Sequence, residues 1–198
     1  MIRTNTKERL LEAALTLFSE KGYDGTSVDE IAESIGIKGP IIYKYFKGKE
    51  ALLAEIVAIS DEAYEKGMEN GLRGADRIKS GADLKAVALQ SITMTMDNEI
   101  ARKVRKLFTI EQFRSPIFAD RATRNQVINL QSVFAKVFRK MMADGIMKEG
   151  NAEIYALEFT APVTLMLQMC DREPHKKDEA LKTIECHMDT FINRYFIA

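Results

Sequence analysis

The stretch GIKGPIIYKYFKGK, residues 36–49, carries the residue types best suited to binding chemistry in this chain. It contains four lysines, three aromatic residues and one proline, and it contains no acidic residue. Lysine ammonium groups bind phosphate oxygens, and tyrosine hydroxyls form hydrogen bonds with phosphates or with base edges. These side chains, presented on the exposed side of a helix, would suit the backbone and the major groove of DNA.

The charge around this stretch is arranged locally. The whole chain is neutral, with 29 basic and 29 acidic residues, so a basic function must be confined to one surface. Residues 24–33 sum to minus four, and residues 36–49 sum to plus four. An acidic segment beside a basic one would orient the domain on DNA, and four lysines indicate a modest electrostatic contribution to affinity. The same residues are also compatible with a solvated face of a helical bundle.

The elements that must position these residues are helices. Apolar residues recur at helical spacing along nearly the whole chain, and neither a strand-like alternation nor a repeat of fixed period is present. The chain is therefore predicted to be all-α, with about nine helices at residues 4–21, 27–35, 40–46, 49–70, 83–97, 99–113, 121–143, 152–171 and 177–196.

The second and third predicted helices have the size of a helix-turn-helix. Ser27 followed by Glu30 predicts an N-terminal cap, and Gly36 ends the helix. Pro40 suits the first turn of the next helix. That helix is too short to be stable alone, so Ile42 and Phe46 are expected to anchor it and to leave its other side exposed.

Residues 6–53, TKERLLEAALTLFSEKGYDGTSVDEIAESIGIKGPIIYKYFKGKEALL, resemble the N-terminal domain of the TetR (tetracycline repressor-like) family of bacterial transcriptional regulators. The resemblance implies an N-terminal three-helix DNA-binding domain and a C-terminal helical domain for ligand binding and dimerisation. We place the boundary near Lys47 and Gly48, which gives domains at residues 1–47 and 48–198. It further implies a homodimeric regulator, most often a repressor, that binds a pseudo-palindromic double-stranded DNA operator and is released by a small-molecule effector.

The resemblance also assigns DNA-contacting positions. Phosphate contacts are implied for Thr26, Ser27 and Lys49, base-edge contacts for Lys38, Gly39 and Ile41, and contacts of either kind for Tyr43, Lys44 and Tyr45. Three residues depart from the common family pattern. Gly39 replaces a frequent basic residue, Ile41 a small or polar one, and Tyr45 a frequent histidine. Base reading is therefore expected to depend on Lys38, Lys44 and an apolar contact from Ile41 to a thymine methyl.

Flexible and aromatic side chains are dense in the region where family members bind ligand. The candidate ligand-binding residues are Met94, Phe108, Gln112, Phe113, Phe134, Phe138, Met141, Phe159 and Met166. They would suit an apolar or amphipathic effector, although single residues at this spacing are more often plain core. Glu111, Gln112 and Gln168 are candidates for polar groups of such a pocket.

The last two predicted helices are the candidate dimer interface. Residues 154–170 carry one charge, Glu158, which predicts burial on more than one side. The candidate interface residues are Leu157, Leu165, Leu181, Ile184, Met188, Phe191, Ile192 and Tyr195. Packing inside a monomer is the alternative.

Other classes of function have little support in the sequence. No nucleophile elbow or phosphate-binding glycine loop is present, and His175 and His187 form no metal-binding motif, so no catalytic residue, metal or cofactor is expected. Two cysteines and the lack of a signal peptide or a membrane span favour the cytoplasm. The remaining alternative is a helical ligand-binding adaptor whose helix-turn-helix contacts a protein. The effector, the operator sequence and the regulated genes are not encoded in recognisable form.

Overall fold

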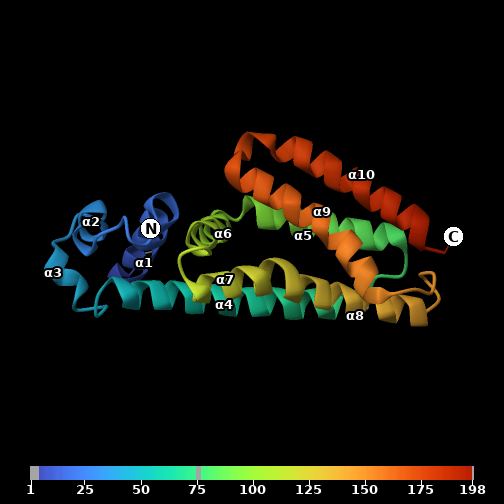
Figure 1. The fold of residues 1–198 in the computed structure, drawn as a ribbon, viewed down its shortest axis with the longest axis horizontal. Coiled ribbons are helices and arrows are strands. Elements are labelled where there is room, and N and C mark those ends of the chain that lie inside the picture. The colour runs from blue at the N-terminus through green and yellow to red at the C-terminus, as the bar shows by residue number, and fades with distance from the viewer. Residues whose placement is uncertain (1–4, 75–76, 198) are drawn as a thin grey trace. The chain divides into compact units, whose positions relative to one another are not determined.

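A computed structural model describes residues 5–74 and 77–197 of the chain. Within these residues lie ten α-helices and no β-strand, which confirms the predicted all-α class (Figure 1). The helices are α1 (Thr6–Lys21), α2 (Val28–Ser34), α3 (Gly39–Ile42), α4 (Lys49–Gly74), α5 (Gly81–Asp97), α6 (Glu99–Glu111), α7 (Pro116–Thr123), α8 (Asn129–Ala143), α9 (Ala152–Arg172) and α10 (Lys177–Tyr195).

The helices form two compact units that share α4, α6 and α7. The first unit comprises the described residues up to Tyr64 together with Lys103–Asp120, and the second comprises those of Glu65–Arg102 and Arg121–Ala198. The units divide the chain differently from a boundary at Lys47 and Gly48. The reason is that the first half of α4 and most of α6 bury apolar side chains against α1, α2 and α3.

The core of the first unit fixes the crossing of the short helices. It is built from the buried faces of α1, α2, α4 and α6, from two residues at the third helix and from one residue of α7: Leu10, Ala14, Leu15, Phe18, Ile31, Ala32, Ile42, Phe46, Leu52, Ile56, Val57, Leu107, Phe108 and Phe118. A capping box begins α1, because Asn5 and Glu8 exchange hydrogen bonds between side chain and backbone. The start predicted at Thr4 lies outside the described residues.

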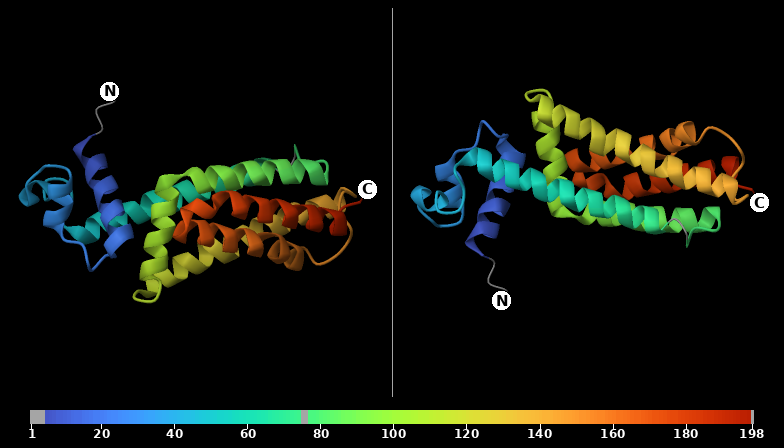
Figure 2. Two further views of the ribbon diagram at one scale, coloured as in Figure 1. Left: turned by 90° about the horizontal axis from the view of Figure 1, so that it is seen from above. Right: turned by 90° about the horizontal axis from the view of Figure 1, so that it is seen from below.

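The second unit is a bundle in which α9 lies between neighbouring helices. Figure 1 and the two views of Figure 2 show α9 and α10 running side by side in opposite directions, with α5 alongside them. Three buried phenylalanines from α8, α9 and α10 form the centre of the core, Phe138, Phe159 and Phe191, and the partly buried Phe134 packs against them. Lys85 of α5 is paired with Asp189 of α10 at 2.7 Å, which ties the outer helices together.

The helices differ from the predicted ones at three places. The third helix ends at Ile42 instead of Phe46, and hydrogen-bonded turns continue to Phe46 because so short a helix lacks internal support. Pro116 begins a separate helix, α7, that was not among the predicted helices. The long helix predicted over 121–143 is interrupted at Arg124–Ile128 by a π-helical segment.

None of the helices in the described part of the chain is both long enough and apolar enough to cross a membrane.

Candidate nucleic-acid interface

The turn between α2 and α3 is closed by the backbone. Gly36 has a φ of +75°, which favours glycine, and the amide of Ile37 donates to the carbonyl of Ala32 at 3.0 Å. Ala32 is fully buried, so its small side chain lets the helices cross closely. Pro40 lies in the first turn of α3, as predicted.

The third helix is anchored as its apolar spacing predicted. Ile42 is fully buried and Phe46 is 6% exposed, and the amide of Phe46 donates to the carbonyl of Ile42 at 2.9 Å. Between these anchors, Tyr43 is 63% exposed and Tyr45 is 42% exposed, with Lys44 also exposed. The structure therefore presents two phenol groups and one ammonium group together on the solvent side of this turn.

The start of the third helix combines an exposed lysine with a tight glycine. Lys38 is exposed, whereas Gly39 and Ile41 are partly buried. A Cβ atom at Gly39 would lie 1.9 Å from Oδ1 of Asp29, so a larger residue at this position would displace the carboxylate. Asp29 therefore places a hydrogen-bond acceptor beside this helix. The charge of residues 24–33, to which Asp29 contributes, did not predict this position.

The two residues before α2 have different roles. Ser27 is exposed, and its hydroxyl oxygen accepts the amide of Glu30 at 3.1 Å, which caps α2. Its hydroxyl hydrogen remains able to donate. Thr26 is 1% exposed, and its hydroxyl donates to the carbonyl of Gly22 at 2.9 Å. In this arrangement the side chain of Thr26 supports the turn and does not face solvent.

Lys49, at the first position of α4, packs against Tyr23. Its ammonium nitrogen donates to the Tyr23 carbonyl at 2.7 Å and lies 4.2 Å from the centre of the Tyr23 ring. Partial burial raises the pKa of the Tyr23 phenol, and the nearby carboxylates of Glu50 and Asp24 raise it further. Tyr23 therefore stays neutral over the physiological pH range.

An ion pair links α1 to α2. Lys21 donates to Glu30, which raises the pKa of the lysine and lowers the pKa of the glutamate. Because Glu30 lies in the first turn of α2, its charge also complements the helix dipole. The acidic segment is thus partly neutralised within the domain.

Glu111, a buried acid of the first unit, does not lie where the sequence predicted. Glu111 was a candidate for a polar group of a ligand pocket. The structure places its carboxylate, 3% exposed, against the turn after α1, where it accepts the amide of Tyr23 at 2.9 Å. Helical spacing could not reveal this contact, since the two residues are 88 positions apart.

The candidate ligand-binding residues do not converge on one enclosed space. Phe108 packs on Phe118 in the first unit, and Phe113 is 92% exposed. Gln112 bonds to its own helix through the Thr109 carbonyl. The others belong to the second unit, where Phe138, Met141 and Phe159 are buried core and Phe134 and Met166 pack on that core.

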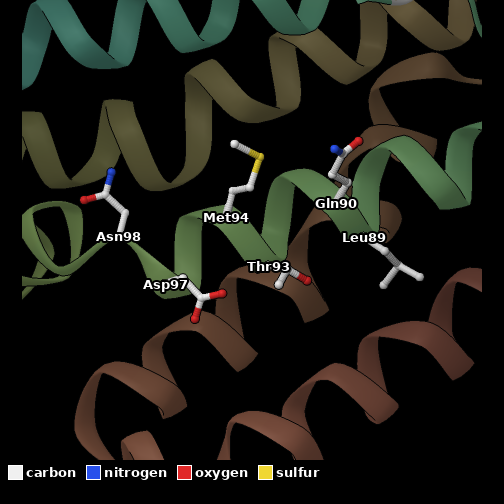
Figure 3. A pocket seen from close by; sticks show the side chains of 6 residues that line it. All are labelled: Leu89, Gln90, Thr93, Met94, Asp97 and Asn98. Atoms are coloured by element: carbon white, nitrogen blue, oxygen red, sulfur yellow. The ribbon is translucent and has the colours of Figure 1, made fainter.

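Met94, the remaining candidate, lines a hollow on the surface of α5. The hollow measures about 590 Å³ and is lined by Leu89, Gln90, Thr93, Met94, Asp97 and Asn98. Figure 3 shows Met94 and Gln90 extending from the same side of the helix. Its lining combines a thioether and an aliphatic side chain with amide and carboxylate groups, so it is amphipathic.

The candidate interface residues divide between core and surface. Ile184, Met188, Phe191 and Tyr195 of α10 are buried in the core of their own unit, and Leu181 and Ile192 are partly buried. Leu157 and Leu165 of α9 are exposed by 42% and 56%. A second hollow, of about 470 Å³, lies between α9 and α10, where the Tyr195 hydroxyl donates to Glu158 at 2.5 Å. This hydrogen bond raises the pKa of Tyr195.

Comparison with known proteins places the N-terminal helices in a described family. Residues 10–56 match the family of bacterial regulatory proteins called the tetR family. The probable HTH-type transcriptional regulator YttP of Bacillus subtilis is 41% identical over 68 residues, which cover 34% of this chain and 33% of YttP. The biofilm operon negative transcriptional regulator IcaR of Staphylococcus aureus is 45% identical over 51 residues, or 26% of this chain and 27% of IcaR. The matches thus span about a third of these relatives or less.

Solved structures resemble the chain over nearly its full length. A protein of Mesorhizobium loti described as a TetR-family transcriptional regulator aligns with a TM-score of 0.71 at 23% identity, covering 96% of both chains. The complex of SmeT with triclosan aligns with a TM-score of 0.70 at 24% identity, covering 97% of this chain and 92% of SmeT. These alignments show the fold. With the match of residues 10–56 to the family and to proteins named as transcriptional regulators, the N-terminal helices of the chain belong to the tetR family of bacterial regulatory proteins.

Proposed function

We propose that this chain is a transcriptional regulator that binds a pseudo-palindromic DNA operator as a homodimer, acts as a repressor, and is released by a small apolar or amphipathic effector. The observation that carries the proposal is the exposed group of Tyr43, Lys44 and Tyr45 between the buried anchors Ile42 and Phe46. Because the anchors fix the backbone, the three side chains are pre-arranged for phosphates and base edges.

The electrostatics of this surface support contact with phosphate. Lys38, Lys44 and Lys47 are exposed on and around the third helix, and the nearest acidic cluster is partly paired through Lys21 and Glu30. With few lysines per subunit, affinity for a single half-site would be low. A dimer that contacts two half-sites about 34 to 36 Å apart would multiply these contacts.

The homodimer is proposed to form through α9 and α10. Ile154, Leu157, Ala161 and Leu165 lie at helical spacing along α9, and all four are exposed. Of these, Leu157 and Ala161 also line the hollow between α9 and α10. An isologous contact of two such faces would bury this apolar stripe, whereas the core residues of α10 would keep their place inside each subunit.

The effector is proposed to bind in the second unit. The hollow on α5 offers an apolar side chain, Met94, beside the amides of Gln90 and Asn98, which suits a small amphipathic molecule. Solved relatives of the fold include SmeT in complex with triclosan and a regulator from Saccharomonospora viridis in complex with choline. Both compounds are available as probes, although neither is assigned to this chain.

The experiment that tests the proposal is sequencing of the genomic DNA fragments that the purified protein retains at a fixed salt concentration. Wild type is compared with a Tyr43→Ala, Lys44→Ala variant and with Lys136→Ala, which removes an exposed lysine of α8. We expect wild type and Lys136→Ala to enrich one pseudo-palindromic site and the Tyr43→Ala, Lys44→Ala variant not to enrich it. No enrichment by any protein would refute DNA binding and favour a protein-binding adaptor. Triclosan or choline, added to a retained complex, then tests for release.

A further inference from the structure

A buried carboxylate of α6 is held against the turn that leads into the helix-turn-helix. Glu111 accepts the amide of Tyr23 at 2.9 Å, and Nη1 of Arg114 lies 3.6 Å from the same oxygen. The side chain of Glu111 is almost fully buried. A carboxylate that is removed from water must be stabilised by such partners. The Tyr23 amide and Arg114 therefore hold the carboxylate of Glu111 in place, and the carboxylate holds the backbone of Tyr23 in place.

The backbone of Tyr23 is held at both of its polar groups. Its amide donates to Glu111 of α6, and its carbonyl accepts the ammonium group of Lys49 of α4. Both contacts involve a charged side chain, which makes them stronger than neutral hydrogen bonds. The position of Tyr23 is therefore determined by two helices outside the helix-turn-helix.

The glycine that precedes Tyr23 leaves room for this arrangement. Gly22 has a φ of +77°, and a Cβ atom there would lie 2.9 Å from Oε1 of Glu111 and 3.2 Å from Arg114. The Gly22 carbonyl accepts the hydroxyl of Thr26. The segment from Gly22 to Thr26 is thus fixed at Gly22, Tyr23 and Thr26, and it ends directly before Ser27, the cap of α2.

We propose that Glu111 is a positioning residue for DNA binding, which sets the turn before α2 from a helix that does not itself belong to the DNA-reading surface. This inference rests on the proposed function. Helix α6 runs without a break from Glu99 to Glu111, and its first residues belong to the other unit. A shift or rotation of α6 would therefore move the carboxylate and release the turn, which lowers operator affinity.

A purely electrostatic role of Glu111 would have the opposite effect on DNA binding. If Glu111 acted only as a negative charge near DNA, removing the charge would strengthen binding in every variant that lacks it. If Glu111 acts through its hydrogen bond to Tyr23, glutamine should preserve binding, because its amide oxygen can accept the same N–H group. Alanine should weaken binding, since it leaves the amide of Tyr23 without its acceptor.

The test measures affinity for a DNA fragment that wild type retains, at several salt concentrations, for Glu111→Ala, Glu111→Gln and Thr109→Ala. Thr109 is an exposed residue of the same helix and serves as the control. We expect Glu111→Ala to bind about tenfold more weakly, the size of one lost hydrogen bond to a charged group. Its salt dependence should be unchanged, since no phosphate contact is lost. Glu111→Gln should bind within about threefold of wild type, and Thr109→Ala like wild type.

Hydrogen exchange of the peptide that covers residues 22–27 provides a second readout. Exchange should be faster in Glu111→Ala than in wild type, with the rest of the chain unchanged. Equal or tighter DNA binding by Glu111→Ala, or equal loss in Glu111→Ala and Glu111→Gln, would overturn the inference. If alanine prevents folding, Glu111→Asp, which keeps the charge and withdraws the acceptor, must bind more weakly than Glu111→Gln.

The same measurements separate this inference from the proposed function. If wild type retains no DNA fragment, the proposed DNA-binding function fails on its own. The exchange comparison then still decides the role of Glu111. Faster exchange in Glu111→Ala would support its hold on the turn, and unchanged exchange would overturn it.

Discussion

The ammonium nitrogen of Lys49 lies 2.7 Å from the carbonyl oxygen of Tyr23 and 4.2 Å from the centre of its ring. The family resemblance assigned Lys49 to a phosphate. An ammonium group has three donor hydrogens, so the bond to Tyr23 leaves two for a phosphate oxygen. Lys49 can therefore donate to a phosphate and keep its bond to Tyr23, and we expect its substitution to affect folding as well as binding.

Lys49→Ala is expected to lower the free energy of unfolding by about 1 to 3 kcal/mol, because it removes a hydrogen bond from a charged donor and a cation–π contact. Urea unfolding of wild type and variant measures the change. Lys47→Ala is the control, since Lys47 is exposed and should change stability by no more than about 0.5 kcal/mol. Equal urea midpoints for the two variants would show that the Tyr23 contact contributes nothing to stability.

Lys44→Ala is expected to weaken DNA binding without changing stability. Lys44 is exposed between two buried anchors, so its loss leaves the core intact. If it neutralises one phosphate, the slope of log affinity against log salt should fall by about 0.9 for each lysine removed. Binding titrations of a retained fragment at four salt concentrations measure this slope, with Lys136→Ala as the control. An unchanged slope would assign Lys44 to a base edge or to no contact.

Much of the fold could be predicted from local sequence signals. The cap at Asn5, the anchors Ile42 and Phe46, and the break at Gly36 each depend on residues within one or two helical turns. No helix was predicted between residues 113 and 121, where α7 begins, because Pro116 can follow the end of one helix as well as begin the next. The π-helical segment at Arg124–Ile128 adds only one residue to a turn, which is too small a change in the apolar spacing to be recognised from the sequence.

The sequence predicted those residues of the candidate site whose role depends on exposure to solvent. It did not predict those whose role depends on contacts between distant parts of the chain. Tyr43, Lys44 and Tyr45 follow from the buried spacing of their neighbours. The contacts of Tyr23 with Glu111 and Lys49 join residues 88 and 26 positions apart, which no periodicity connects. For the same reason the apolar stripe of α10 could be recognised, but whether it faced a partner or its own core could not be decided.

The cap of α5 makes stability depend on acid pH. The carboxylate of Asp83 accepts the amide of Lys79 at 3.0 Å and the hydroxyl of Ser80 at 2.9 Å, and these bonds lower its pKa below the ordinary value of 3.8. Because the folded state binds the proton less readily than the unfolded chain, this contribution is complete above the ordinary pKa. It is lost as the pH falls through that value to the lowered pKa.

Asp83→Asn should therefore lose less stability than wild type between pH 6 and roughly pH 3, a range set by ordinary carboxylate titration. Urea midpoints at the two pH values measure the difference, and other carboxylates cancel in the comparison. Asp178→Asn, at an exposed carboxylate in the first turn of α10, is the control. An acid sensitivity equal to that of wild type in Asp83→Asn would mean that the cap is not formed at neutral pH.

The exposed stripe of α9 gives a direct test of the proposed dimer. Leu165 is 56% exposed in the monomer, so Leu165→Glu should change the stability of an isolated subunit by no more than about 0.5 kcal/mol. In an isologous contact the two glutamates would be buried near each other without partners, and dimerisation should be abolished. Sedimentation measures the mass, and Val87→Glu, at an exposed residue of α5, is the matched control. Since two half-sites need two subunits, a folded monomeric Leu165→Glu should also lose the operator, whereas a dimeric one would place the interface elsewhere.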